Sequence, residues 1–111
     1  MATYAFMSKL LPGKLQTWMH YVREMKTTYK SDMEASRARL GVTKEEVWLQ
    51  QSPEGACAVI YWEAADIGVV FQQLMMSEEP FDKWYRDRIL IEVHGMNPSA
   101  PPPPMNEKVM G

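Results

Sequence analysis

The sequence predicts an α+β fold, with an antiparallel sheet and helices that cover one of its faces. Segments rich in β-branched and aromatic residues alternate with amphipathic segments that repeat every three to four residues. The tetrapeptide "SPEG", residues 52–55, is a turn signal between two β-type segments, which predicts a hairpin. The chain has 111 residues, 46% of them hydrophobic, and this suits one domain around a small core.

Three strands are predicted from their aromatic and β-branched content. The first covers residues 3–11, "TYAFMSKLL", and stops at Pro12-Gly13, a dipeptide that interrupts regular structure. The arms of the hairpin are residues 45–51, "EEVWLQQ", and residues 56–63, "ACAVIYWE".

A long helix is predicted from residue 14 to residue 40, followed by Gly41, a residue that tolerates the left-handed conformation at a helix end. Polar residues on the opposite side, Arg37 among them, are assigned to solvent. At 1.5 Å per residue the helix would be roughly 39 Å long, so we expect a bend or break, near Thr27-Thr28. Its apolar face comprises Leu15, Trp18, Val22, Met25, Tyr29, Met33, Ser36 and Leu40.

Two shorter helices are predicted after the hairpin. Asp66 is a good N-cap for the first, whose apolar stripe comprises Ile67, Val70, Phe71, Leu74 and Met75. Pro80 suits the first turn of the second helix, which runs from about residue 81 to residue 93 and ends at Gly95. The face that this helix turns toward the core comprises Phe81, Trp84, Tyr85, Arg88, Ile89 and Val93.

The chain divides into a folded domain, residues 1–97, and a proline-rich C-terminal segment, residues 98–111. Within that segment "PSAPPPP", residues 98–104, predicts an extended polyproline conformation. We interpret it as a stiff connector along the protein's own surface, with a ligand for aromatic-groove domains as the alternative. "MNEKVM", residues 105–110, predicts either a short edge strand or a frayed end.

The strand over residues 56–63 is apolar on both faces. One face carries Ala56, Ala58, Ile60 and Trp62, and the other carries Cys57, Val59, Tyr61 and Glu63. The predicted order βαββα(α)β is the ferredoxin-like plan, in which helices cover only one face of the sheet. The chain has no element left to cover the other face. We therefore expect a homodimer, in which two sheets pack face to face as a closed, dimeric α/β barrel.

Charge and composition narrow the classes of function. The net charge is −2 and no basic run occurs, so nucleic acid is not an expected partner. No apolar run reaches the length of a membrane span, and the N-terminus lacks the basic region of a signal peptide, so no membrane association is expected.

Cys57 is the single cysteine and is interpreted as a small buried hydrophobic residue. A chain with no internal disulfide favours a reducing compartment, and the cytoplasm is the expected location.

Four ordered motifs, "LPGKLQTW", "LGVTKEEVWLQ", "GACAVIYWEAAD" and "SEEPFDKWYRDRILIEVHG", resemble the dimeric α/β barrel (ferredoxin-like) superfamily. More narrowly, the chain is similar to a small bacterial family within it that has no assigned activity. The resemblance spans most of residues 3–97. The superfamily includes cofactor-free monooxygenases, haem-degrading enzymes, muconolactone isomerases and chlorite dismutases, so it implies a fold and a dimer rather than one reaction. It also implies a ligand pocket between the sheet and the helices.

The candidates for ligand binding are aromatic or charged side chains among apolar ones. They are Trp62, at the end of a strand, and Trp84, Tyr85 and Arg88 in the last helix. The arginine would hold an anionic group in a bidentate grip. The alternative is an aromatic pair that only fills the core, with arginines paired to nearby carboxylates.

The candidates for catalysis are His94, Arg86 and Tyr61. His94 would act as a general base because its pKa is ordinarily near neutral. The structural alternative is a helix-terminal histidine that bonds the last carbonyls. His94 and His20 are also the candidates for a haem ligand, and the spacing of the histidines and the cysteine predicts no metal site.

From these patterns we predict that the chain binds a small apolar or aromatic molecule between its sheet and its helices, as a homodimer and without a cofactor. A cofactor-independent monooxygenase or isomerase is the alternative. Haem binding is the second alternative. Whether a reaction takes place is left open.

Overall fold

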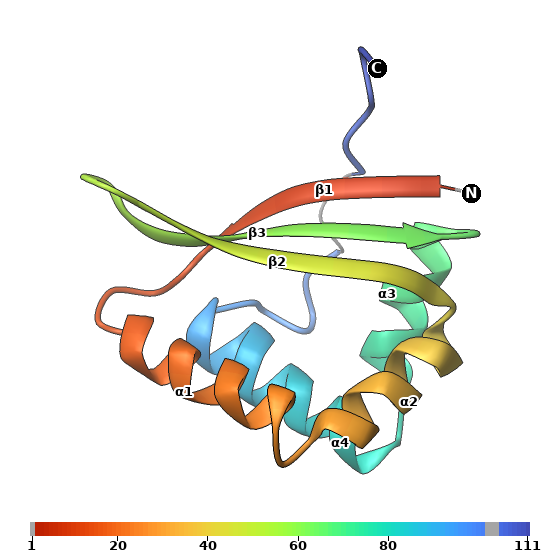
Figure 1. Cartoon of the computed structure of the whole chain (residues 1–111), viewed down its shortest axis with the longest axis horizontal. Coiled ribbons are helices and arrows are strands. Elements are labelled where there is room, and N and C mark those ends of the chain that lie inside the picture. The colour runs from red at the N-terminus through yellow and green to blue at the C-terminus, as the bar shows by residue number, and fades with distance from the viewer. Residues whose placement is uncertain (1, 102–104) are drawn as a thin grey trace.

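The computed structural model of the chain, described for residues 2–101 and 105–111, confirms an α+β fold (Figure 1). A three-stranded antiparallel sheet is covered by helices on one face. The elements are β1 (Ala2–Lys9), α1 (Leu15–Lys26), α2 (Lys30–Leu40), β2 (Val42–Ser52), β3 (Gly55–Ala64), α3 (Ile67–Met76), α4 (Pro80–Tyr85) and the π-helix η1 (Arg86–Val93). This order is compatible with the ferredoxin-like plan.

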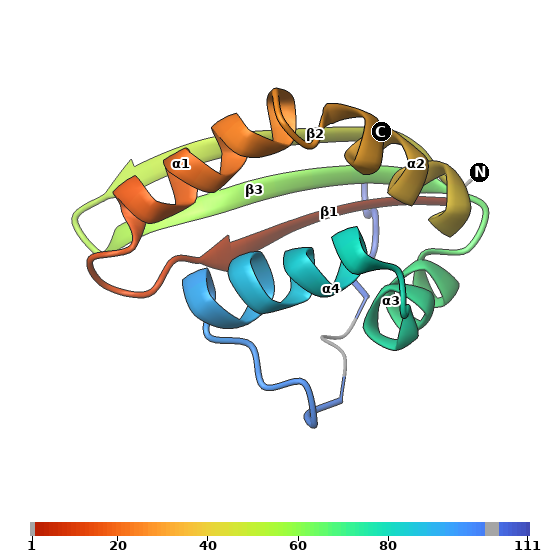
Figure 2. The same ribbon diagram turned by 90° about the horizontal axis from the view of Figure 1, so that it is seen from below.

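The strand order is β1-β3-β2, so the predicted hairpin is confirmed and its second arm is central. Phe6 of β1 lies opposite Ile60 of β3, which lies opposite Val47 of β2. Strand β2 starts three residues earlier than predicted, at Val42, because the chain leaves α2 through Gly41 (φ 82°) directly into the sheet. Helices α1 and α2 lie over β2 and β3, whereas α3, α4 and η1 lie over β1 (Figure 2).

The predicted break in the long helix is confirmed. Helix α1 ends at Lys26 and α2 begins at Lys30. At the break Thr27 turns its hydroxyl back to the Arg23 carbonyl (2.8 Å), and the Tyr29 backbone N–H bonds the Glu24 carbonyl (2.8 Å). Such side-chain bonds to the backbone compete with the helical ladder.

The assignment of Arg37 to solvent is wrong. Its side chain is buried, with a relative exposure of 7%. The helical pattern placed Arg37 on the polar side of one straight helix. Because the helix axis changes direction at the break, α2 instead packs this residue against β2.

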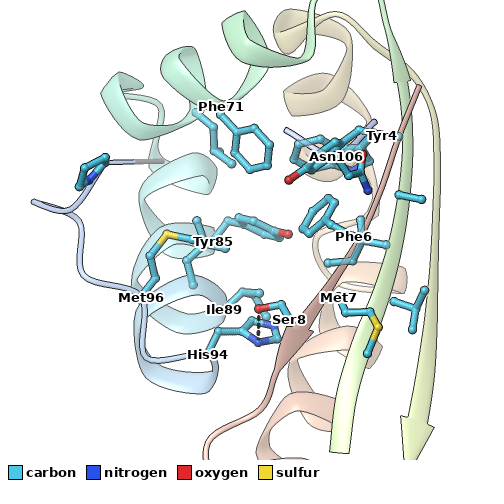
Figure 3. A pocket seen from close by; sticks show the side chains of 17 residues that line it. Tyr4, Phe6, Met7, Ser8, Phe71, Tyr85, Ile89, His94, Met96 and Asn106 are labelled. Carbon is cyan, nitrogen blue, oxygen red and sulfur yellow. Dashed lines mark hydrogen bonds between the residues drawn. The ribbon is translucent and has the colours of Figure 1, made fainter. Parts of the chain in front are cut away.

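The last predicted helix is continuous but changes its winding. Helix α4 passes into the π-helix η1, where the His94 backbone N–H bonds the carbonyl of Ile89, five residues earlier (3.2 Å). In an α-helix, the nine steps from Tyr85 to His94 make about two and a half turns, so the two residues lie on opposite faces. With the wider π turn, the same nine steps make close to two turns. Tyr85, Ile89 and His94 therefore face β1 together (Figure 3).

The prediction for Arg88 is wrong. This residue was predicted on the core face, but it is exposed, and its guanidinium bonds Glu92 one turn later (3.3 Å). Val93, on the other hand, is fully buried as predicted.

The C-terminal segment departs from the predicted extended form. Asn97 accepts a bond from the Ser99 N–H through its side chain (2.9 Å), which makes a turn instead. Residues 102–104 of the predicted polyproline segment lie outside the described residues. Residues 105–111 form no strand, so within the described chain the fourth strand is absent and the outer edge of β1 is unpaired. The segment passes that edge and ends on the side of the sheet away from the helices (Figures 1 and 2).

The core lies between the sheet and the helices. Its most deeply buried large apolar side chains come from β3, α3 and η1, and are Trp62, Ile67, Val70, Leu74 and Val93. Asp66 caps α3 as predicted, accepting a bond from the Val69 N–H (3.2 Å). None of the described helices is both long and apolar enough to cross a membrane.

The outer face of the sheet has no covering element in the described chain. At its centre Val59 of β3 lies between Met7 of β1 and Trp48 of β2 in one row across the strands. Met7 and Trp48 are exposed to 65% and 51%. Cys57, on the same face of β3, is buried at 8% exposure, as predicted. An aromatic and two aliphatic side chains thus form an apolar centre on this face.

Candidate functional site

A cavity of about 760 Å³ lies along β1, between it and the helices on that side, and its lining also includes Met7 and Val59 of the outer face of the sheet. We call it the β1 chamber. Its walls come from β1, β3, α3 and η1, and Pro101 and Asn106 of the C-terminal segment border its outer side, which stays partly open (Figure 3). The volume falls in the range of small-molecule sites in proteins.

The walls of the β1 chamber are largely aromatic. Strand alternation places Tyr4 and Phe6 of β1 on the helix side, next to Trp62 of β3, and α3 adds Phe71. The ring centroids are 4.6 Å apart for Tyr4 and Phe6, 5.6 Å for Phe6 and Trp62, and 5.1 Å for Trp62 and Phe71. No charged side chain lines this chamber among the residues that the structure describes.

His94 stands at one end of the β1 chamber, where the π-helix places it. Its Nδ1 lies 2.8 Å from the Lys9 carbonyl oxygen and 2.9 Å from the Ser8 hydroxyl. A carbonyl only accepts hydrogen bonds, so Nδ1 carries the proton and donates it. Burial lowers the pKa of His94, although the bond to the Lys9 carbonyl acts in the opposite direction. The ring is therefore neutral near pH 7, and Nε2 has a free lone pair.

This tautomer decides what the Ser8–His94 pair can do. A general base must take the serine proton on an unprotonated nitrogen, but the nitrogen beside Ser8 is the protonated one. The pair is therefore not arranged as a nucleophile with its base. His94 instead offers Nε2 as an acceptor, or as a base toward a bound molecule.

Tyr85 is another polar residue of the β1 chamber. It is buried, and burial raises the pKa of its phenol to about 12, although the Arg37 guanidinium beside it acts in the opposite direction. The Arg37 Cζ lies 4.6 Å from the centroid of the Tyr85 ring. The hydroxyl therefore stays protonated and can donate a hydrogen bond.

Behind the chamber wall lies a buried network of charges. The Arg37 Nε donates to Glu45 (2.8 Å), and the other carboxylate oxygen of Glu45 accepts from the Trp62 indole N–H (2.7 Å). Burial alone would lower the pKa of Arg37, but the charge and hydrogen bond of Glu45, together with Tyr85 and Asp82, outweigh it and raise that pKa. The network fixes the orientation of Trp62 in the chamber wall.

A second carboxylate, Asp82, is fully buried in the same layer. It accepts bonds from Ser36, from Ser77 (2.6 Å) and from Arg39 (3.2 Å). Burial would raise the pKa of Asp82, yet these three bonds together lower it. Sequence reasoning did not single out Arg37, Glu45 or Asp82 as site-supporting residues, because their partners are distant in sequence or sit in other elements.

Three of the residues predicted for the site meet in the β1 chamber: Trp62, Tyr85 and His94. Trp84 lies outside it, in an aromatic cluster on the helix layer where its ring stacks on Phe81 (5.7 Å between centroids). Tyr61 lies on the outer face of the sheet, where its hydroxyl bonds Glu63 (2.7 Å).

The basic candidates also lie outside the β1 chamber. Arg86 donates to the carbonyls of Leu74 and Ser77, both at 2.7 Å, and so ties the end of α3 to the start of η1. Arg88 faces solvent. His20 is exposed and pairs with Glu24 one turn later in α1. Within the described residues no three histidine, cysteine or acidic side chains are grouped to hold a metal ion.

The lowered pKa of His94 predicts a pH-dependent stability. In the unfolded chain the histidine pKa is about 6.5, so the unfolded chain binds a proton more readily than the folded one. The contribution of His94 to the free energy of unfolding is therefore complete above that pH and is lost as the pH falls. Replacing His94 with Gln should therefore flatten the fall in the free energy of unfolding between about pH 7.5 and pH 5. Urea unfolding at several pH values measures it, with His20→Gln as the matched control. An unchanged slope in His94→Gln would contradict the assignment.

No known protein family matches the sequence of this chain. No curated protein matches it either.

Proposed function

We propose that the chain binds a small, mainly apolar and uncharged molecule in the β1 chamber. The observation that carries this proposal is an aromatic cavity of about 760 Å³ with neutral polar groups and no charged lining among the described residues. A charged ligand would lose its hydration there without compensation. A hydroxyl on the ligand fits, because it can donate to the free Nε2 of His94.

The test compares 1-naphthol with naphthalene, which differ only in the hydroxyl group. Titration calorimetry should show binding of both, with 1-naphthol favoured by about two- to tenfold, the range of one net hydrogen bond. In His94→Phe the preference should disappear while naphthalene binding stays. His20→Phe, on the exposed face of α1, is the control and should behave as wild type. The proposal fails if neither compound binds the wild-type protein.

A second candidate function is proton transfer at carbon, as in an isomerase or a cofactor-independent monooxygenase. It is favoured by the neutral His94 ring with its proton fixed on Nδ1, which leaves a base in an apolar cavity. His94 would take a proton from the carbon next to a carbonyl group, and solvent would return one. Exchange of that hydrogen of 2-tetralone in D₂O, followed by NMR, should be accelerated by the protein and not by His94→Phe. Equal rates would remove this candidate.

Haem binding is less well supported. Haem carries two propionates, and the β1 chamber offers them no cation among the described residues. His20 is exposed on α1 and does not line this chamber, which leaves His94 as the axial ligand to test. A haem titration that gives no Soret shift would exclude it.

We also propose that two copies pair through the outer face of the sheet, as expected for a dimeric α/β barrel. The apolar row Met7–Val59–Trp48 supports this, with polar residues such as Lys9, Gln50 and Lys44 around it. An apolar centre with an aromatic anchor and a polar rim is the anatomy of a protein interface.

A further inference from the structure

The β1 chamber extends along η1 between two polar side chains. His94 stands at one end, and Tyr85 lies about two turns of helix away, further into the chamber (Figure 3). The nine residue steps between them advance on the order of 10 Å along the helix axis. The volume of about 760 Å³ lies toward the upper end of the range for small-molecule sites. The chamber therefore has room for an elongated molecule that reaches both side chains.

The wall between these two side chains is apolar. Ile89 lies between them on η1, and Phe6 lies across from the helix on β1 (Figure 3). Aromatic rings and aliphatic groups offer a ligand no hydrogen bond of ordinary strength. The middle of a bound molecule should therefore be apolar, and flat where it packs on the Phe6 ring.

The Tyr85 hydroxyl is a hydrogen-bond donor toward the chamber. Its ring points from the helix toward β1, with the hydroxyl at the leading end (Figure 3). Arg37 does not line the chamber, but its guanidinium bonds the hydroxyl oxygen. A guanidinium carries only donors, so the oxygen accepts that bond and the phenol proton stays available. The positive charge beside the oxygen polarises the O–H bond and strengthens it as a donor.

His94 has the opposite character. The proton on its Nδ1 is directed at the Lys9 carbonyl oxygen (2.8 Å), with the Ser8 hydroxyl also close (2.9 Å), so Nε2 is left as an acceptor. A ligand group that meets Tyr85 must therefore accept a hydrogen bond, and one that meets His94 must donate. A molecule with an acceptor at one end and a donor at the other satisfies both in a single orientation.

Charge selects the kind of acceptor at the Tyr85 end. The Arg37 charge is already balanced by Glu45, whose oxygen lies 2.8 Å from Nε. No charged side chain among the described residues lines the chamber, so a carboxylate would be buried there without a partner. A carbonyl oxygen accepts hydrogen bonds and carries no charge, which fits this end.

We propose that the ligand of the β1 chamber is an elongated, flat aromatic molecule with a carbonyl group at one end and a hydroxyl group at the other. The carbonyl oxygen accepts from the Tyr85 hydroxyl, and the hydroxyl donates to Nε2 of His94. The aromatic body lies between them, along Phe6 and Ile89. This inference rests on the proposed function and names the class of ligand for the same site, with Tyr85 as the residue that selects the carbonyl group.

The test uses four compounds that differ only in their end groups: biphenyl, 4-hydroxybiphenyl, 4-acetylbiphenyl and 4-acetyl-4′-hydroxybiphenyl. In titration calorimetry with the wild-type protein, the acetyl group should tighten binding by about two- to tenfold, the range of one net hydrogen bond. The hydroxyl group should add a gain of the same size independently. The compound with both groups should therefore bind most tightly.

Two variants assign the gains to their residues. Tyr85→Phe should abolish the gain from the acetyl group and keep that from the hydroxyl group, whereas His94→Phe should do the reverse. Tyr21→Phe is the matched control, because the Tyr21 hydroxyl bonds Glu92 (3.0 Å) and does not line the chamber, and it should behave as wild type. If Tyr85→Phe does not fold, infrared spectroscopy of the wild-type protein replaces it. The ¹³C-labelled carbonyl of bound 4-acetylbiphenyl should then absorb at a lower frequency than in cyclohexane.

Four outcomes overturn the inference and leave the proposed function standing. They are a hydroxyl gain without an acetyl gain, an acetyl gain that persists in Tyr85→Phe, a carbonyl band that does not shift, and binding of 1-naphthol without binding of any biphenyl. Failure of the proposed function gives a different result, because 1-naphthol, naphthalene and all four biphenyls would then fail to bind.

Discussion

Replacement of Arg37 by Met is expected to lower the free energy of unfolding by about 3–5 kcal/mol, the range for breaking a buried ion pair from one side. The variant keeps most of the side-chain volume but leaves the Glu45 carboxylate buried without its cation. Since Glu45 also holds the Trp62 indole, the loss reaches the wall of the β1 chamber. Guanidinium unfolding at one fixed protein concentration, followed by circular dichroism, measures it.

The matched control is Arg88→Met, which removes an arginine whose partner Glu92 lies near the surface. Its effect should be far smaller, because exposed pairs are screened by water. A double variant, Arg37→Met with Glu45→Leu, should recover part of the lost stability, because it also removes the Glu45 carboxylate that the single variant leaves buried and unpaired. A loss below about 1 kcal/mol in Arg37→Met would mean that the pair is not buried in solution.

Replacement of Trp48 by Glu should dissociate the proposed dimer. A central aromatic anchor contributes about 2 kcal/mol or more to an interface, and a two-fold symmetric dimer contains the substitution twice. About 4 kcal/mol corresponds to roughly a thousandfold rise in the dissociation constant. Analytical ultracentrifugation over a range of concentrations should show a dimer for the wild-type protein and a monomer for Trp48→Glu.

Val69→Glu is the control for this experiment. Val69 is also an exposed apolar residue (40%), but it lies on α3, away from the outer face of the sheet. It should leave the dimer unchanged. A wild-type protein that sediments as a monomer at every concentration would refute the pairing, and a dimer that persists in Trp48→Glu would place the interface elsewhere.

Local patterns in the sequence were sufficient for most of the fold. Pro12-Gly13, the "SPEG" turn, Asp66 and Gly41 each specify a boundary through their own backbone or side-chain chemistry, so they could be read without knowing the rest of the structure. The break after Lys26 follows the same logic, whereas the start of β2 was predicted three residues too late. For "MNEKVM" the sequence left an edge strand and a frayed end open, and the described chain has no strand there. Whether such a short segment forms a strand depends on a neighbour that the sequence does not name.

The candidate site was predictable only in part. Trp62, Tyr85 and His94 were selected as polar or aromatic residues in apolar surroundings, and all three line the β1 chamber. The role of Arg37 was missed because a charged residue on a helix is ordinarily solvated, and its partner Glu45 lies on β2. The joint orientation of Tyr85 and His94 could not be derived either. It depends on the π winding of η1, whereas the helical pattern was evaluated at 3.6 residues per turn.

The position of Trp48 has a spectroscopic consequence. It is the one tryptophan of the four on the outer face of the sheet, at 51% exposure, whereas Trp18 and Trp62 are buried at 5% and 2% and Trp84 is half-buried among other rings. The long-wavelength part of the intrinsic emission therefore comes mainly from Trp48. Pairing of two copies would shift that part toward the blue and shield it from a soluble quencher, so the protein carries its own fluorescent indicator of assembly. A molecule in the β1 chamber would instead change the emission of Trp62, which separates the two events in one spectrum.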